Sequence, residues 1–291
     1  MTGTFDETWF DIVSVSVEIE GGAALQPLLE AMHAAREDDL TTVIDKLKIA
    51  LLQIEKVGKQ LARMFEKCDP AAFYWKIRKF LSGSENMAGL GLPNGLEYKG
   101  VNNNERKHYM GATAGQSSLF PALDIIFGID HYEKSPSESH TQTQSQPNAL
   151  LLKMKEFMPG LHRAFLSHLA KVANLRGYVL FKKASDPESE QVKELTEAYD
   201  KCVHQIKLFR DTHIQIVTRY ILTQAKRGPP EGWEDYRVRV HESGQEKVQS
   251  KTPNDKKDNE EPAIQGTGGS DLMPFLKNNR DETNAAKMQA N

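Results

Sequence analysis

Apolar residues recur at helical spacing along much of the chain. Between residues 41 and 65 they stand three, four or seven positions apart, at Ile44, Leu47, Leu51, Ile54, Leu61 and Phe65. This is the period of one face of an α-helix. The spacing therefore predicts an amphipathic helix over residues 41–65.

Capping residues and proline mark where further helices begin. Asp69 can cap a helix and Pro70 suits its first position, so a second helix is predicted over about residues 71–81. Further helices are predicted after Ser117-Ser118 and over about residues 149–157, 160–172 and 272–277. The run 12–19 is the one candidate strand, because its valines and isoleucines alternate with polar residues.

The longest predicted helix covers about residues 190–226. Its apolar stripe comprises Val192, Leu195, Tyr199, Cys202, Ile206, Phe209, His213, Ile216 and Tyr220. A helix of this length crosses most of a domain, at roughly 1.5 Å per residue. The pattern therefore predicts an all-α fold, a large helical domain built around one long central helix.

Two polar segments interrupt this domain. Residues 134–147 contain no apolar side chain, and residues 226–262 are rich in charge, so both are predicted to be loop insertions and the second to be disordered. The single helical domain then comprises residues 1–133, 148–225 and 263–280. Residues 281–291 are expected to form a tail.

Composition narrows the class of protein. The 291 residues include 37 basic and 40 acidic side chains, a net charge of −3, which argues against nucleic-acid binding by bulk charge. Two cysteines make no disulfide framework. The first twenty residues lack the basic residues of a signal peptide, and no apolar run reaches the roughly 20 residues that span a bilayer. We expect a cytoplasmic protein that binds no membrane.

His213 interrupts the apolar stripe of the longest helix. It is either a core histidine bonded to a backbone carbonyl or an axial ligand of haem iron, for which a neutral imidazole on a rigid helix is suited. Arg210 lies one turn earlier, about 4.5 Å along the axis. It is either a solvated arginine or a partner for a haem propionate.

A second cluster lies in the predicted helix 71–81. Tyr74 and Arg78 are four residues apart and share a helix face. They are either a core aromatic and a surface arginine, or a site for a ligand with a planar ring and a carboxylate. Two glycine-rich loops, 111–118 and 266–269, match no phosphate-binding motif, and the histidines match no HExxH pattern.

Four segments of the chain resemble indoleamine 2,3-dioxygenase. They are residues 69–83, 114–118 (AGQSS), 209–221 (FRDTHIQIVTRYI) and 266–273 (GTGGSDLM). The last three stand in the family's order, and the resemblance extends from about residue 10 to residue 277. It implies a haem b enzyme of tryptophan catabolism, the kynurenine pathway. Such an enzyme inserts both atoms of O2 into the indole 2,3-bond of L-tryptophan, or of a related indole, to give N-formylkynurenine.

The resemblance also implies roles for individual residues. His213 matches the proximal ligand of the iron, Arg210 the arginine that pairs with a propionate, and Asp124 an acidic residue of that network. Small residues above the haem correspond to Ala114 and Gly115. The substrate-binding residues correspond to Arg78 for the carboxylate, Phe73 and Tyr74 beside the indole, Phe10 and Ser14 in the distal pocket, and Thr267 and Gly268 in the glycine loop.

The resemblance begins near the distal-pocket segment, so we expect that the family's N-terminal small domain has no counterpart in this sequence. One alternative is therefore a truncated member that binds haem, or signals, with weak or no turnover. A helical scaffold without a cofactor is a third possibility. The expected partners are L-tryptophan and O2 alone, and the expected state is a monomer.

Overall fold

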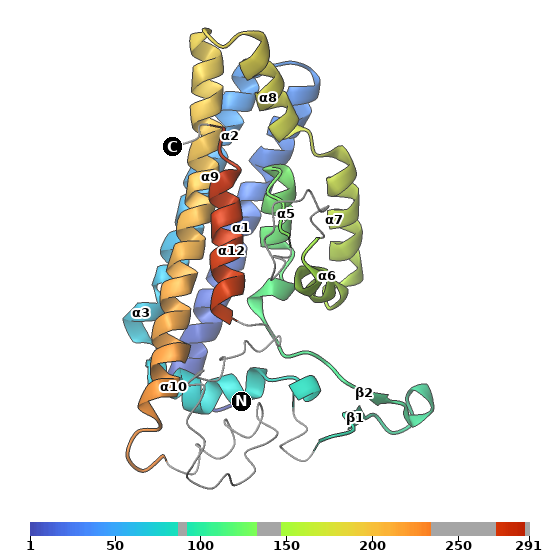
Figure 1. Cartoon of the computed structure of the whole chain (residues 1–291), viewed down its shortest axis with the longest axis vertical. Coiled ribbons are helices and arrows are strands. Elements are labelled where there is room, and N and C mark those ends of the chain that lie inside the picture. The colour runs from blue at the N-terminus through green and yellow to red at the C-terminus, as the bar shows by residue number, and fades with distance from the viewer. Residues whose placement is uncertain (87–91, 133–146, 234–271, 289–291) are drawn as a thin grey trace, which may run out of the picture. The chain divides into compact units, whose positions relative to one another are not determined.

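The computed structural model describes residues 1–86, 92–132, 147–233 and 272–288 (Figure 1). Within these residues the fold is helical apart from one small sheet. Its strands β1 (Leu96–Glu97) and β2 (Arg106–Lys107) are antiparallel, with Leu96 opposite Lys107. The prediction of an all-α fold is confirmed. The polar segment 134–147, apart from Pro147, and most of 226–262 lie outside the described residues.

The chain forms two compact units. The first comprises Met1–Trp9, Lys67–Thr113 and Gln215–Phe275, and the second comprises Phe10–Glu66, Ala114–Ile214 and Leu276–Asn291. Helices that lie wholly or mainly in the second unit are α1 (Phe5–Arg36), α2 (Leu40–Ala62), α3 (Met64–Lys67), α5 (Leu119–Ile126), α6 (Ala149–Glu156), α7 (Gly160–Val172), α8 (Leu175–Ser185), α9 (Glu190–Val217) and α12 (Leu272–Ala285). The short 3-10 helix η6 (Ala114–Gln116) precedes α5.

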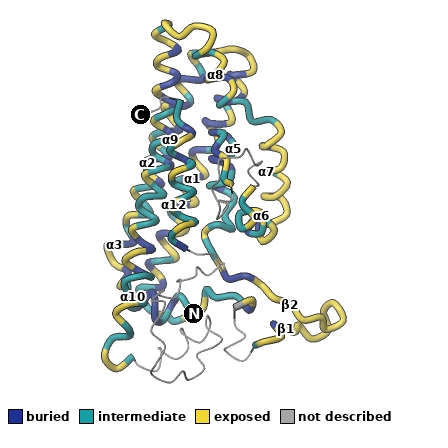
Figure 2. The backbone as a smooth tube through the Cα atoms, viewed as in Figure 1, coloured by how far each residue is buried: buried dark blue, intermediate teal, exposed yellow. Residues whose placement is uncertain are grey.

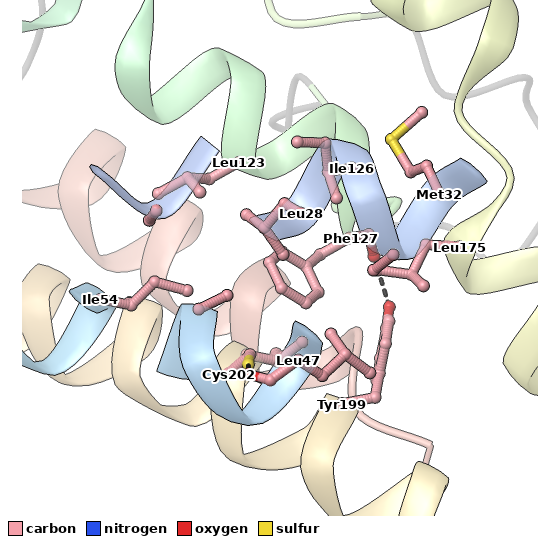
Figure 3. Close-up of a cluster of buried hydrophobic side chains, with 14 of the residues drawn as sticks. Leu28, Met32, Leu47, Ile54, Leu123, Ile126, Phe127, Leu175, Tyr199 and Cys202 are labelled. Atoms are coloured by element: carbon pink, nitrogen blue, oxygen red, sulfur yellow. Dashed lines mark hydrogen bonds between the residues drawn. The ribbon is translucent and has the colours of Figure 1, made fainter. Parts of the chain in front are cut away.

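The core of the second unit joins α1, α2, α5, α8 and α9 (Figure 3). Buried positions recur along each of these helices, with exposed positions between them (Figure 2). Tyr199 is fully buried, its hydroxyl donates to the carbonyl of Phe127 at 2.5 Å, and the two rings meet edge to face at 5.4 Å. The thiol of Cys202 donates to the Leu47 carbonyl at 3.4 Å. The part of the predicted stripe from Leu195 to Ile206 is thus the core face of α9.

Helix α1 corrects the prediction of a strand at residues 12–19. Val13 and Val17 are buried, whereas Val15 between them is 57% exposed, so burial follows the four-residue period of a helix. Apolar and polar residues do alternate here, but only the residues on one face of the helix are buried. Tertiary contacts therefore override the local β signal.

The same helix also corrects the statement that no apolar stretch approaches membrane-spanning length. Helix α1 has 32 residues and is long and apolar enough to cross a bilayer by length and composition. Its second half contributes Ala24, Leu28, Ala31 and Met32 to the hydrophobic core. A helix that packs in the core of a folded domain meets the same criteria as a membrane span.

The first unit contains two turns of π-helix. The predicted helix 71–81 is helical throughout, but it consists of α4 (Pro70–Ala72), the π-helix η1 (Phe73–Ile77) and the 3-10 helix η2 (Arg78–Leu81). Asp69 caps it, since its side chain accepts from the Ala72 amide at 2.8 Å. A second π-helix, η7 (Thr218–Leu222), follows α9 and leads into α10 (Thr223–Arg227).

The two π-helices pack against each other through aromatic side chains. Phe73 and Tyr220 meet edge to face with ring centroids 5.8 Å apart. The Tyr220 hydroxyl donates to the carbonyl of Cys68 at 2.9 Å, which satisfies a polar group that the packing buries. Two further 3-10 helices in this unit are η3 (Ser84–Asn86) and η5 (Asn102–Asn104). These contacts fix η1, the segment that carries the candidate substrate residues.

Candidate functional site

The candidate metal ligand His213 lies near the end of α9. Its side chain is half-buried, and within the described part of the chain neither ring nitrogen has a hydrogen-bond partner. Burial and the nearby charge of Arg210 lower the pKa of His213 to about 4. The imidazole is therefore neutral near pH 7 and keeps a lone pair, which is the form that binds a metal.

The surroundings of His213 fit an axial haem ligand. The described residues contain no cluster of three or more His, Cys, Asp or Glu side chains arranged to hold a metal ion. Haem iron takes its equatorial ligands from the porphyrin, so a single neutral histidine of this kind suits it as an axial ligand. The alternative of a core histidine bonded to a backbone carbonyl does not describe this side chain, because its nitrogens have no such partner among the residues placed.

Arg210 and Asp124 form a buried ion pair in the second unit. Nη2 of Arg210 donates to both carboxylate oxygens of Asp124 at 2.8 Å. Nη1 donates to the Asn279 carbonyl at 3.1 Å and to the Thr283 hydroxyl of α12. Burial acts to raise the pKa of Asp124, but the charges of Arg210 and His131 outweigh it and the pKa is lowered. The carboxylate is therefore ionised near pH 7.

This geometry brings Asp124 and Arg210 together, as the resemblance implies. The guanidinium of Arg210 donates four hydrogen bonds to protein oxygens. Pairing of Arg210 with a propionate stays a prediction.

Two further residues, His131 and Glu282, belong to this network, and the sequence pattern predicts neither. His131 lies within hydrogen-bond distance of two carboxylates, with Nε2 3.1 Å from Asp124 and Nδ1 2.6 Å from Glu282. Glu282 also accepts from the Tyr132 amide at 3.0 Å. Because Glu282 is 151 residues from His131 in sequence, no local motif predicts their contact.

Other predicted cofactor and pocket residues lie elsewhere in the second unit. The Ser14 hydroxyl donates to the Phe10 carbonyl at 2.9 Å, one turn back on α1. Ala114 and Gly115 form part of η6, and a side chain on Gly115 would overlap the sulfur of Met154. The absence of a side chain at Gly115 therefore lets α6 approach η6 closely.

The predicted substrate residues of the first unit form an aromatic and cationic group. The Arg78 guanidinium carbon lies 5.5 Å from the ring centroid of Tyr74, as their spacing of four residues predicts. Burial lowers the pKa of Arg78 and raises that of Tyr74. Arginine nevertheless stays charged in proteins, so Arg78 is a largely buried cation beside an aromatic face. Phe73 lies next to them in η1.

Thr267 and Gly268, the predicted residues of the glycine loop, lie outside the described residues. Their roles stay predictions. The candidate residues that the structure does describe therefore form two sets. His213, Arg210, Asp124, Phe10, Ser14, Ala114 and Gly115 belong to the second unit, and Phe73, Tyr74 and Arg78 belong to the first.

Comparison with known proteins adds an independent finding. A family model described as indoleamine 2,3-dioxygenase matches residues 1–286. The chain is 39% identical to the indoleamine 2,3-dioxygenase of Saccharomyces cerevisiae, over 97% of this chain and 59% of that protein. It is 32% identical to indoleamine 2,3-dioxygenase 2 of Mus musculus, over 94% and 57%.

A third relative carries a different substrate in its name. The chain is 33% identical to a 6-hydroxytryptophan 2,3-dioxygenase of Fusarium equiseti, over 76% of this chain and 50% of that protein. The chain thus spans between half and three fifths of the length of these relatives.

Proposed function

Because the chain belongs to the indoleamine 2,3-dioxygenase family, we propose that it binds haem b and serves in the dioxygenation of L-tryptophan or a related indole. Both atoms of O2 enter the indole 2,3-bond and the product is N-formylkynurenine, a step of tryptophan catabolism. One structural observation carries this proposal. His213 presents a neutral imidazole, without a hydrogen-bond partner among the described residues, at the position that the family's proximal-ligand motif marks.

In this proposal the cofactor and the residues of the chain have separate roles. Bound haem supplies the dioxygen chemistry, and the protein supplies the axial ligand, orientation and a dry environment. His213 holds the iron from α9. Asp124 holds Arg210 through two hydrogen bonds of 2.8 Å, so the arginine beside the iron ligand has a fixed place. No side chain is required as a general base.

The substrate residues suit an amino acid with an aromatic side chain. Arg78 is a largely buried cation and binds the carboxylate, because a guanidinium matches a carboxylate with two parallel hydrogen bonds. The family resemblance assigns Phe73 and Tyr74 to the wall beside the indole, Phe10 and Ser14 to the distal pocket, and Thr267 and Gly268 to the glycine loop. The name of the Fusarium equiseti relative supports a substrate class that includes ring-hydroxylated tryptophan.

The proposal includes a cytoplasmic location and a monomeric state. The two cysteines, Cys68 and Cys202, are free and buried, which agrees with a reducing compartment.

The proposal is tested by comparing three purified proteins. Wild type, His213→Ala and His168→Ala are titrated with haemin and followed by the Soret band, then reduced and assayed for N-formylkynurenine with tryptophan and O2. His168 lies exposed on α7 and serves as the matched control. We expect wild type and His168→Ala to bind one haem per chain and His213→Ala to bind at least about tenfold more weakly.

Each other outcome has a defined meaning. Full haem content and activity in His213→Ala would refute the assignment of the ligand. Haem binding in wild type without product would support the alternative of a non-catalytic haem-binding member. Absence of any Soret band would support the third possibility, a helical scaffold that binds no cofactor.

A further inference from the structure

Four charged side chains meet in the second unit, drawn from three helices and the turn after α5. His131 follows α5 and contacts Asp124 of α5 at 3.1 Å and Glu282 of α12 at 2.6 Å. Arg210 of α9 contacts Asp124 at 2.8 Å. These four side chains are only 8 to 17% exposed. They form one buried network, which we call the His131 network.

The geometry favours the protonated form of His131. A neutral imidazole has one N–H donor and one acceptor nitrogen, whereas an imidazolium has two donors. Each ring nitrogen of His131 lies closest to a carboxylate oxygen, and a carboxylate only accepts. A neutral ring would set the Nε2 lone pair against the anionic oxygen of Asp124 at 3.1 Å, with Nη2 of Arg210 as a more distant donor at 3.4 Å. The imidazolium satisfies both contacts, and the network then holds two positive and two negative charges.

Helix α12 meets both cations of the network within two turns. Glu282 contacts His131, while the Asn279 carbonyl and the Thr283 hydroxyl accept from Arg210. Helices α9 and α12 accordingly lie side by side (Figure 1). Asp124 is shared, because it contacts both Arg210 and His131. The imidazolium thus links the carboxylate of α12 to the carboxylate that holds Arg210.

We propose that His131 is a positioning residue, whose imidazolium bridges Asp124 and Glu282 and thereby fixes both α12 and Arg210, one turn before His213. The bridge is a property of the folded chain alone. Its effect on haem binding rests on the function proposed above. Deprotonation of His131 removes one positive charge from between two carboxylates and leaves Arg210 alone to balance them.

The sign of the pH dependence follows from the groups that face the ring. Burial acts to lower the pKa of His131, but Asp124 and Glu282 outweigh burial and the charge of Arg210, so the pKa is raised. A raised pKa stabilises the folded state most below the unfolded value of about 6.5, and this stability is lost as the pH rises through the folded value. Arginine keeps its charge throughout, so His131 is the titrating cation of the network.

The first test uses the haem-free chain labelled with 13C-histidine. The ring signals of His131 are assigned by their loss in His131→Gln and followed by NMR between pH 5 and 10. We expect His131 to titrate above the ordinary histidine value of about 6.5, and the Glu282→Gln variant to lower its midpoint. A His131 midpoint at or below about 6.5 would overturn the bridge, and this measurement requires only the wild-type protein and one assignment variant.

The second test measures α12 itself. Hydrogen exchange of the amides of residues 278–283 is compared at pH 6.5 and pH 9 after correction for the intrinsic exchange rate. We expect protection to fall in wild type and in the control His168→Gln, whereas in His131→Gln it is low at both pH values. Glu282→Gln and the double variant with His131→Gln should resemble each other, since either change breaks the same bridge. Protection in His131→Gln equal to wild type would overturn the positioning role.

The third test separates this inference from the proposed function. Haemin titration of His131→Gln is expected to give a dissociation constant about fivefold higher than wild type at pH 6.5, with the difference shrinking at pH 9. Unchanged affinity would refute the link to the haem side while the NMR and exchange results still decide the bridge. If wild type itself bound no haem, the proposed function would fail and the first two tests would be unaffected.

Discussion

Replacement of Asp124 by asparagine probes the charge balance of the buried network. The side chain keeps its size but loses its charge, and its new NH2 group faces the N–H donors of Arg210 and His131. Two buried cations would then have only Glu282 as a counter-charge. We expect Asp124→Asn to destabilise the folded chain strongly.

The size of the effect follows from burial. Asp124 and Arg210 have side chains only 12% exposed, so solvent screens the pair weakly. Removal of one partner of a buried ion pair costs about 3–5 kcal/mol, mainly because the other charge is left uncompensated. For a domain of this size that corresponds to a fall in melting temperature of about 10 °C.

The assay is thermal and urea unfolding followed by circular dichroism, with Glu197→Gln as the matched control. Glu197 pairs with Lys201 on α9, but the side chains are 62% and 57% exposed. We expect no resolvable change in the control, because exposed pairs contribute little. The pKa of Asp124 is lowered, so its contribution is present above about pH 4 and is lost as the pH falls through the folded pKa. An Asp124→Asn midpoint within error of Glu197→Gln would refute the reasoning.

Two further predictions concern α9. Tyr199→Phe keeps the ring contact with Phe127 but leaves its buried carbonyl without the hydroxyl donor, so the urea midpoint should fall by the equivalent of about 1–3 kcal/mol; an unchanged midpoint would contradict this. The pKa of His213 is lowered to about 4, whereas the unfolded chain takes up this proton near pH 6.5, so stability should fall as the pH drops between these values. His213→Gln in the haem-free chain should flatten that part of the curve of melting temperature against pH, and parallel curves for variant and wild type would count against it.

The sequence pattern predicted those helices that bury one clear apolar stripe. The predicted helix 160–172 coincides with α7, and 41–65 corresponds to α2 and the first two residues of α3. Helix α1 was misjudged because its valines alternate with serines, a strand-like pattern that packing overrides. Helix α8 was not predicted, because Gly177 and two exposed apolar residues, Leu180 and Phe181, obscure its stripe.

The candidate site was predictable to the extent that it is local in sequence. The i, i+4 pair Tyr74 and Arg78 lies in one continuous helical segment and the pair Arg210 and His213 lies in α9, so spacing alone predicts that the members of each pair are neighbours. The His131 network depends on long-range contacts. Residues 281–291 were expected to be a tail, yet α12 continues to Ala285, because contacts with Arg210 and His131 hold a polar segment helical. Such long-range contacts cannot be predicted from local composition.

The π-helices of the first unit also bear on how this chain tolerates changes of length. A π-turn holds one residue more than the α-turn it replaces, and each added residue rotates the following helix by about 100°. Deletion of one residue within 218–222 would restore an ordinary α-turn and turn Tyr220 away from Phe73, while α10 would stay helical. An insertion or deletion here therefore reorients the aromatic packing around the buried Tyr220 without breaking the backbone ladder.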